Sequence, residues 1–313
     1  MPVTTGYRSF LSTDDLTDDE LHALVARGVA HSRGELDHRP LAGAVVGVYF
    51  RMTSTRTRVA FSTAALRLGG QIVPLGPNDL QTNTGESDAD TGAVLARMLD
   101  VLVARVDAPL SALAGWAGHG RMAVVNAMAA EEHPTQAVTD LVTLTCRFGG
   151  VPGLRVRYVG EGNNSAASLA LALSRYPDVW LDLRTPPGYG LAADVLARAR
   201  AHARRSGARV TERADMVDLS PVDVVYTTRW QTTGTSKADP HWRRVFQPFR
   251  VTAALWERSP DAVFLHDLPA HRGDEVTADV LDGPASAVLD QAGHKLSGAL
   301  AVLDFCRTGH TWT

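Results

Sequence analysis

The sequence contains very few cysteines. Only Cys146 and Cys306 occur in 313 residues. Two cysteines are too few for a disulfide framework, and these two do not have the spacing of metal ligands. Sparse thiols are typical of the reducing cytoplasm. The sequence therefore predicts a cytoplasmic protein without a disulfide scaffold.

Long apolar runs are also missing. No segment approaches the eighteen or so uninterrupted apolar residues of a membrane-spanning helix. The first residues, MPVTTGYRSFLSTDDLTDDE, carry acidic groups where a signal peptide needs a basic region followed by an apolar one. We expect a protein that neither crosses a membrane nor is exported.

A large charge of one sign is absent as well. Lysine and arginine together number 31 and aspartate and glutamate 34, which gives a net charge of -3. This balance gives no reason to expect a nucleic-acid or membrane surface. The His, Asp and Glu groupings lack convincing metal-ligand spacing. A small anionic ligand would have to be bound by local cationic groups, and no metal or other cofactor is expected.

What the sequence does contain is a regular alternation of patterns. Short apolar runs rich in β-branched residues alternate with longer helical patterns, which is typical of βαβ units and a parallel sheet. We predict an α/β protein. Predicted strands cover 44–50, 71–75, 101–106, 123–126, 155–159, 179–184, 222–227 and 262–266. Predicted helices cover 58–68, 88–99, 134–147, 165–174, 191–204 and 290–306.

The length of the chain favours two domains, because 313 residues exceed the usual size of one core. The segment FGGVPGL at 148–154 concentrates glycine and proline and is the best candidate hinge. We predict a first domain at 1–148, a second at 149–289, and a C-terminal helix at 290–313 that returns to the first. Each domain should be a mostly parallel sheet flanked by helices, with the active site in the cleft between them.

Hydroxyl and guanidinium side chains follow the predicted strand 44–50. Ser54, Thr55, Arg56 and Thr57 stand where this strand gives way to a helix. The N-terminus of a helix presents unpaired N–H groups and a partial positive charge, and arginine adds charge-assisted hydrogen bonds. The group predicts a phosphate site. The simpler alternative is that Ser54 or Thr55 only caps the helix.

A second group favours the phosphate site over simple capping. His133 and Gln136 open another predicted helix, and because they are three residues apart they share one helix face. Arg105 lies near the end of the predicted strand 101–106. A single histidine at a helix start is more often structural, but together with these neighbours it predicts a ligand contact.

Five motifs then occur together. They are STRTR at 54–58, HPTQ at 133–136, EGNN at 161–164, TPPGY at 185–189 and HDLPAHRGDEV at 266–276. Their order and spacing resemble those of the aspartate and ornithine carbamoyltransferase family, over nearly the whole chain. The resemblance implies an enzyme that transfers the carbamoyl group of carbamoyl phosphate to an amine.

The resemblance also implies site residues. Carbamoyl phosphate would be bound by Ser54, Thr55, Arg56, Thr57, Gln81, Arg105, His133, Gln136 and Lys295. The catalytic residues among them would be Arg56, Thr57, Arg105 and His133. These would stabilise the oxyanion of the tetrahedral intermediate and the charge on the departing phosphate. Lys295 stands where the family has an arginine. Gln81 matches a loop that commonly reaches across a subunit interface, which implies a homotrimer.

The acceptor side departs from the ornithine enzymes. Their HCLP motif reads HDLP here, so Asp267 replaces a cysteine. Their TDxWxSMG-like loop is TTRWQTTG at 227–234, so Thr228 replaces an acid. The same segment resembles the TRxQ loop with which aspartate carbamoyltransferases hold a carboxylate. The predicted acceptor-binding residues are Asn164, Thr228, Arg229, Gln231, Thr232, Thr233, Asp267 and Leu268.

These departures favour an acceptor other than ornithine. A carboxylate at position 267 would hold a cationic amine, and Arg229 would hold a carboxylate, although an exposed loop arginine is the alternative. A short diamino acid such as 2,3-diaminopropionate would satisfy both. The product would be a ureido amino acid of the kind found in peptide antibiotics, which suggests antibiotic biosynthesis.

Other interpretations stay open. The nearest is an ordinary ornithine carbamoyltransferase of arginine biosynthesis. A catalytically silent homologue that binds a ligand would have little need for a whole anion site. A dinucleotide-binding oxidoreductase is disfavoured because the segment 160–164, GEGNN, lacks the third glycine of that fingerprint.

Overall fold

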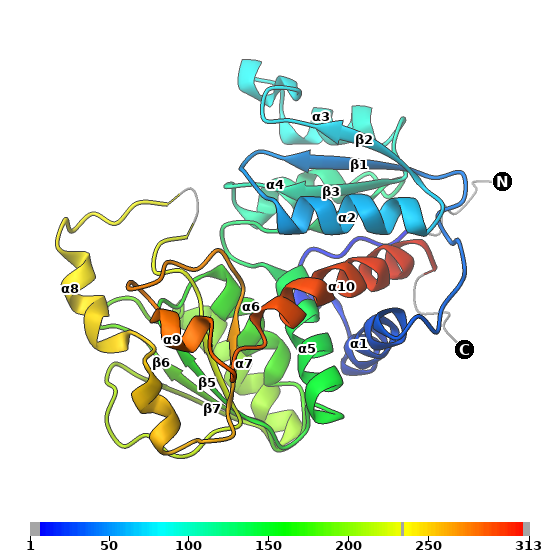
Figure 1. Cartoon of the computed structure of the whole chain (residues 1–313). Helices are drawn as coiled ribbons and strands as arrows, with labels where there is room; N and C mark the ends of the chain where they lie inside the picture. The colour runs from blue at the N-terminus through cyan, green and yellow to red at the C-terminus, as the bar shows by residue number, and fades with distance from the viewer. Residues whose placement is uncertain (1–6, 233–234, 309–313) are drawn as a thin grey trace. The chain divides into compact units, whose positions relative to one another are not determined.

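The computed structural model describes residues 7–232 and 235–308. The chain forms two compact units (Figure 1). Unit 1 comprises Met1–Val142 and His294–Thr313, and unit 2 comprises Thr143–Gly293. The domains predicted from the sequence have slightly different limits. The predicted first domain ends at 148, and the predicted returning helix begins at 290. Both unit boundaries fall inside helices, α5 (Pro134–Phe148) and α10 (Val288–Thr308).

The described part of unit 1 contains a four-stranded parallel sheet with the order β2-β1-β3-β4. Its strands are β1 (Val45–Phe50), β2 (Gln71–Leu75), β3 (Val101–Arg105) and β4 (Ala123–Asn126). Strands β1, β3 and β4 are buried over most of their length, as expected for parallel strands covered by helices on both faces. Strand β2 is the edge strand and is largely exposed.

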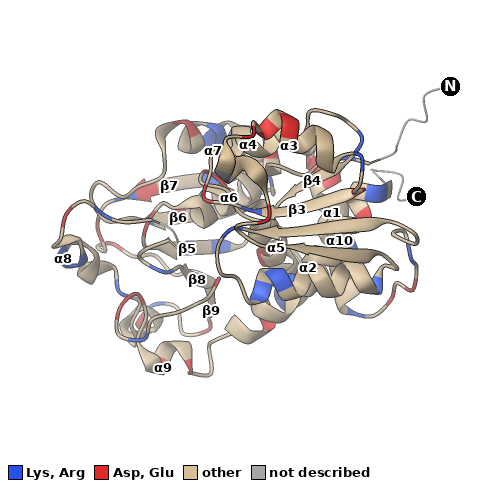
Figure 2. Cartoon of the chain, turned by 90° about the horizontal axis from the view of Figure 1, so that it is seen from above, with Lys and Arg blue, Asp and Glu red and all other residues tan. Residues whose placement is uncertain are grey.

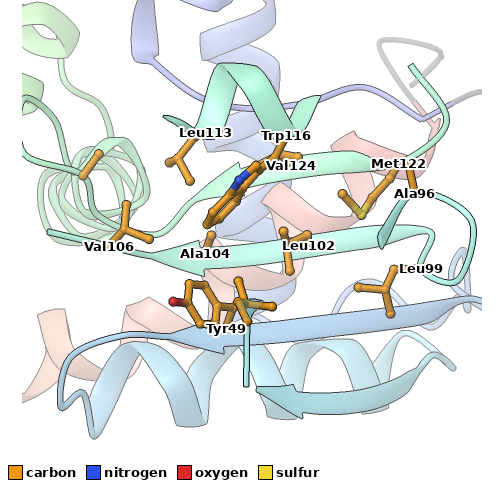
Figure 3. Close-up of a cluster of buried hydrophobic side chains, with 12 residues drawn as sticks. Tyr49, Ala96, Leu99, Leu102, Ala104, Val106, Leu113, Trp116, Met122 and Val124 are labelled. Atoms are coloured by element: carbon orange, nitrogen blue, oxygen red, sulfur yellow. The ribbon is translucent and has the colours of Figure 1, made fainter. Parts of the chain in front are cut away.

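Unit 1 also contains the helices α1 (Asp18–Ser32), α2 (Arg56–Arg67), α3 (Asp88–Leu95) and α4 (Leu110–Ala117). Helix α2 packs on β1 and β2, α4 packs on β4, and α3 packs on α4. One buried cluster joins β1, β3 and β4 to α4 (Figure 3). In it the ring of Tyr49 meets the ring of Trp116 edge to face, with 5.8 Å between centroids. Packing of this kind fixes the strand ends from which the site side chains project.

The described part of unit 2 contains a five-stranded parallel sheet with the order β7-β6-β5-β8-β9. Its strands are β5 (Arg155–Val159), β6 (Trp180–Arg184), β7 (Arg209–Arg213), β8 (Val224–Thr227) and β9 (Val263–His266). The accompanying helices are α6 (Asn164–Leu173), α7 (Ala193–Ser206), α8 (Trp242–Phe246) and α9 (Ala278–Leu281). The predicted fold class, two α/β domains with mostly parallel sheets flanked by helices, is confirmed.

In both sheets the first strand of the unit lies between two later strands. Strand β1 lies between β2 and β3, and β5 lies between β6 and β8. At such a switch point the loops leave the carboxyl ends of neighbouring strands in opposite directions, and ligands of open α/β sheets bind there. The loops after β1 and β3 and those after β5 and β8 are therefore the places where the fold predicts binding.

Charged residues of both signs are scattered along the helices and loops of each unit (Figure 2). No helix among the described residues is long and apolar enough to span a membrane.

Candidate active site

The turn after β1 leads directly into α2. The helix begins at Arg56 with Thr55 as its N-cap, and the Thr55 side chain makes no capping hydrogen bond. The simpler alternative was a cap by Ser54 or Thr55, and the structure has no such cap by Thr55. The first N–H groups of a helix need partners. Thr57 is buried, whereas Ser54 and Arg56 are half-buried and Thr55 is exposed.

The last arginine of the same motif has a structural role. Arg58 donates from its guanidinium to the carbonyl of Phe50 over 3.2 Å, and its charge lies 5.1 Å from the centroid of the Phe50 ring. Arg58 therefore stabilises the end of β1. A variant of Arg58 can serve as the control for the corresponding variant of Arg56.

Three predicted residues from distant parts of the chain line one small cavity in unit 1. Thr57, His133 and Lys295 meet there, and the complete lining is Thr57, Ala60, Phe61, His133, Thr135, Thr139, Lys295 and Ala299. The cavity volume is about 10 Å³, which is close to the room that one water needs. The side chains around it are thus already packed against one another.

His133 is buried and electrically neutral near pH 7. Burial lowers the pKa of His133 well below its ordinary value, and the positive charges of Lys295 and Arg105 lower it further. The ring Nδ1 lies 3.3 Å from Thr135 Oγ1. A neutral imidazole can donate one hydrogen bond but is a poor source of a proton. This agrees with a role as a positioned donor.

Gln136 is held from both ends of its amide. Its Nε2 donates to Asp140 Oδ1 over 2.7 Å, and its Oε1 accepts from Lys295 Nζ. A cation on one side and a carboxylate on the other leave only one orientation of the amide. Gln136, Asp140 and Lys295 are all buried, so Lys295 is connected to the HPTQ motif although it lies 159 residues away.

Arg105 and Gln81 differ in their surroundings. Arg105 is the last residue of β3 and pairs in register with Phe50, the last residue of β1, so it stands beside the turn that carries Arg56. Gln81 is exposed in the 3-10 helix η2 (Gln81–Thr84), and its Oε1 accepts a hydrogen bond from Thr84 over 2.9 Å. The contacts of Gln81 are thus local.

The loops after β5 and β8 of unit 2 meet at Thr228. Asn163 Nδ2 donates to Thr228 Oγ1 over 3.0 Å, and Tyr158 Oη lies 2.8 Å from the same oxygen. The Tyr158 hydroxyl donates its hydrogen to the carbonyl of Glu161, so Thr228 must donate to Tyr158. A threonine hydroxyl has one hydrogen and two lone pairs. Thr228 can therefore only accept from a ligand.

Asp267 stands at the end of the neighbouring strand. The register pairs Thr227 with His266, so Thr228 and Asp267 are adjacent at the carboxyl edge of the sheet. Ser165 Oγ donates to Asp267 Oδ2 over 2.8 Å. His266 Nδ1 lies 3.5 Å from Oδ1 but accepts the N–H of Leu268, so it does not donate there. One oxygen of the half-buried Asp267 carboxylate thus remains available to a cationic group.

The other predicted acceptor residues are less closely joined. Arg229 is half-buried, and Gln231 Nε2 donates to the carbonyl of Thr235 over 2.7 Å. Thr232 is half-buried with a hydroxyl turned inward. Leu268 lies in a left-handed backbone conformation, with φ of 55°. Asn164 is the buried first residue of α6, and Thr233 lies outside the described residues.

Sequence reasoning missed several residues that surround these groups. Ser165, Tyr158 and Asn163 bind the predicted side chains directly, and Lys237 forms an ion pair with Glu161. The signal for some of them was present, because Glu161 and Asn163 lie inside the EGNN motif. Lys237 lies in no motif, and its partner is 76 residues away.

The donors gathered in unit 1 are cations, an amide and hydroxyls, which suit an anionic ligand better than a metal ion. Among the described residues, no group of three or more His, Cys, Asp or Glu side chains is arranged to hold a metal ion.

Comparison with known proteins gives a consistent result. Residues 8–145 match the carbamoyl-P binding domain of aspartate/ornithine carbamoyltransferase, and residues 152–306 match its Asp/Orn binding domain. An ornithine carbamoyltransferase of Symbiobacterium thermophilum is 38% identical over 303 residues, which cover 95% of this chain and 96% of the relative. One of Acidothermus cellulolyticus is 39% identical over 301 residues, 95% of this chain and 96% of the relative.

Solved structures agree. The ornithine carbamoyltransferase of Pyrococcus furiosus superimposes with a TM-score of 0.89 at 35% identity, covering 98% of this chain and 99% of that chain. That of Gloeobacter violaceus gives a TM-score of 0.84 at 35% identity, covering 96% and 99%.

Proposed function

The chain belongs to the aspartate/ornithine carbamoyltransferase family of enzymes, and we propose that it carbamoylates the side-chain amine of a diamino acid, with ornithine as the first candidate. The named relatives support ornithine, because those at 35% to 39% identity over nearly the whole chain are ornithine carbamoyltransferases. The relatives thus favour ornithine over the short diamino acid, which only the substitutions at the acceptor positions favour.

In unit 1 the proposed ligand is carbamoyl phosphate. Its phosphate binds to the turn from Ser54 to Thr57 and the first N–H groups of α2, and its carbonyl oxygen is held by Arg105, His133 and Thr57. Attack by a neutral amine turns this oxygen into an oxyanion, which preorganised donors stabilise more in the transition state than in the ground state. The C–O bond to phosphate then breaks, and Arg56 stabilises the departing charge.

The proton of the attacking amine has to leave during the reaction. The low pKa of His133 leaves the ring neutral, so it serves as a hydrogen-bond donor to the carbonyl. The departing phosphate, whose oxygens can accept a proton, is the proposed acceptor of the amine proton. Gln136 and Lys295 complete the surroundings of the carbamoyl group.

In unit 2 the proposal is carried by one observation, the adjacency of Asp267 and Thr228 at the carboxyl edge of the sheet. The ornithine pattern has an acid at the position of Thr228 and a thiol at that of Asp267. The acid is thus moved from one strand end to its neighbour, and the carboxylate is retained. A carboxylate there still holds the cationic form of a diamino acid before its amine loses a proton.

A second acceptor, 2,3-diaminopropionate, is favoured by the same carboxylate. The Asp267 side chain has three heavy atoms beyond Cβ, whereas a cysteine side chain has one, and so Asp267 occupies space that the end of an acceptor would otherwise fill. A shorter acceptor fits such a site. Its product, a ureido amino acid, would belong to antibiotic biosynthesis.

The test is a colorimetric ureido assay with carbamoyl phosphate and a panel of amines. The panel contains ornithine, putrescine, lysine, aspartate, 2,4-diaminobutyrate and 2,3-diaminopropionate. Strong turnover of ornithine would support the first acceptor, and turnover of 2,3-diaminopropionate alone would support the second. Binding of carbamoyl phosphate without turnover of any amine would refute the proposal and favour a catalytically silent homologue.

We also propose that the enzyme is a homotrimer. Five large apolar side chains of unit 1 are exposed, namely Val59 and Leu66 on α2, Val73 on the edge strand β2, Val94 on α3 and Met98 just after it. Exposed apolar surface of this kind favours association. The exposed Gln81 would then serve the site of a neighbouring copy. Sedimentation equilibrium should give three times the mass of 33.5 kDa, and a monomer would refute the proposal.

A further inference from the structure

Lys237 is an enclosed cation that lies close in the sequence to the predicted acceptor residues Thr228, Arg229 and Gln231. Its side chain is 4% exposed. Its ammonium group lies 5.1 Å from the ring centroids of Tyr189, Trp242 and Phe246. Lysine is rarely buried unless it is paired, and aromatic faces compensate a buried cation only in part. An enclosed lysine in this position therefore needs a reason.

The ion-pair partner of Lys237 is Glu161. Lys237 Nζ donates to Glu161 Oε1, while Glu161 Oε2 is buried and has no hydrogen-bond partner among the described residues. Burial raises the pKa of Glu161, and the Lys237 hydrogen bond opposes this. A buried carboxylate oxygen without a donor is costly. It marks a place where a ligand N–H group would be favourable.

The pair lines a cavity of about 550 Å³. The lining residues are Glu161, Gly188, Tyr189, Thr232, Thr235, Ser236, Lys237, Ala238 and Asp239. Asp239 is exposed at the rim, and its carboxylate accepts the amide N–H of His241. The enclosed part thus contains one positive and one negative group. Thr232 Oγ1 is also buried there without a partner among the described residues.

This cavity is joined to the predicted acceptor residues through Tyr158. The Tyr158 hydroxyl contacts Thr228 Oγ1 over 2.8 Å and donates to the carbonyl of Glu161. Asn163, two residues after Glu161, donates to the same Thr228 oxygen. The Lys237–Glu161 pair therefore belongs to the same group of loops as the residues that would hold the reacting amine.

We infer that Lys237 and Glu161 recognise the zwitterionic end of the acceptor amino acid, with Lys237 donating to its carboxylate and Glu161 Oε2 accepting from its α-ammonium group. The enclosed cation of Lys237 and the half-buried carboxylate of Glu161 match the two charges that every free amino acid carries at its α-carbon. The inference rests on the proposed function and names specificity residues of the same site.

The test uses amines that differ only in the carboxylate. Ornithine and putrescine form one such pair, and 2,3-diaminopropionate and 1,2-diaminoethane form the other, so that either proposed acceptor can be examined. In Lys237→Met the preference for the amino acid over its decarboxylated partner, measured as the ratio of kcat/KM values, should fall on the order of 10- to 100-fold. The loss should come from a higher KM of the amino acid.

Glu161→Gln gives a different expected result. The amino acid and its decarboxylated partner both carry the ammonium group that Glu161 would bind. This variant should therefore lower kcat/KM for both, and the ratio of the two values should stay within about threefold of that of the unaltered enzyme. Arg243→Met is the matched control, because Arg243 lies over the ring of Trp242, 4.5 Å from its centroid, and is not among the residues that line the cavity. It should change neither value. If Lys237→Met lowers both members equally, Lys237 only holds the loop and the inference is wrong.

Failure of the proposed function can be told apart from failure of this inference. If the unaltered enzyme turns over no amine, the proposed function is refuted. The same ligand pairs are then titrated by calorimetry in the presence of carbamoyl phosphate. A preference for the amino acids that Lys237→Met removes would still support the inference, and binding without such a preference, or no binding, would overturn it.

Discussion

Several predicted residues of unit 1 lie together around one cavity, whereas Thr228 and Asp267 of unit 2 are hydrogen-bonded to residues outside the predicted site. Thr57, His133 and Lys295 share one cavity, and Lys295 reaches Gln136. In unit 2, by contrast, the partners of Thr228 and Asp267 are Tyr158, Asn163 and Ser165. A bond-breaking site requires fixed geometry among its own donors. A recognition site can instead change its ligand by altering a few side chains on a fixed support.

The two sites also differ in charge. The unit 1 group combines Arg56, Arg105 and Lys295 with a neutral His133, which suits a dianionic ligand. The unit 2 group contains the carboxylate of Asp267 and the Lys237–Glu161 pair, which suits an amino acid. Variants that affect one site and spare the other should make this contrast measurable.

The largest effect is expected at the phosphate turn. Arg56→Ala should lower kcat by about 10²- to 10³-fold, because it removes a donor to the charge that builds up in the transition state. Steady-state kinetics with saturating amine would measure it. Arg58→Ala is the matched control, since its guanidinium bonds to Phe50, and should cost less than tenfold. Equal losses in the two variants would contradict the assignment of Arg56.

A smaller effect is expected at the exchanged acid of unit 2. Asp267→Cys should lower kcat/KM for the best acceptor by about 10- to 100-fold, because it removes a charged hydrogen-bond partner. The double variant Thr228→Asp with Asp267→Cys restores the pattern of the ornithine enzymes and should recover or raise ornithine turnover. An increase on the best acceptor with Asp267→Cys alone would show that the assignment of Asp267 is wrong.

The next effect concerns the contact that closes the unit 1 site. Lys295→Met leaves the buried Oε1 of Gln136 without its donor and should reduce the free energy of unfolding by about 1–3 kcal/mol while raising the KM for carbamoyl phosphate. Urea unfolding and steady-state kinetics measure the two quantities. Lys295→Arg retains the charge and should lose less. Unchanged KM in Lys295→Met would remove Lys295 from the site.

The smallest effect is a pH dependence of stability. The pKa of His133 is lower in the folded protein than its ordinary value of about 6.5. The unfolded chain therefore binds the proton first, and the folded state loses stability as the pH falls below about 6.5. His133→Asn should lose this contribution. The free energy of unfolding, measured with urea, should then decline less between pH 7.5 and 5.5 than it does in the unaltered protein. Parallel declines would contradict a buried neutral imidazole.

Much of the fold follows from the sequence, because buried parallel strands are short apolar runs with β-branched residues. The strands 71–75, 123–126 and 155–159 have their predicted limits. Strand β7, RVTER, was missed because an edge strand retains charged residues. Helix α1 was also missed, although Thr17 and Glu20 form a capping box at its start. Helix α3 ends at Leu95 instead of 99, since the apolar residues beyond it pack as a turn.

The candidate site could be predicted only where its chemistry is local. The turn from Ser54 to Thr57 and the pair His133 and Gln136 are each contained in one strand-to-helix segment, so their residue types predict an anion site. The Ser165–Asp267 hydrogen bond joins residues 102 apart, and the Lys237–Glu161 pair joins residues 76 apart. Neither has a periodic or spacing signal, because only the folded sheet brings such side chains together.

The return of the chain to unit 1 at His294 has a consequence for the order of synthesis. A nascent chain that has been made through Gly293 contains every residue of unit 2 but not Lys295, which lines the cavity of Thr57 and His133. Because domains tend to fold as they leave the ribosome, unit 2 can fold while the cavity of unit 1 still lacks Lys295. The half of the enzyme that holds the reactive donor is then the last to be completed.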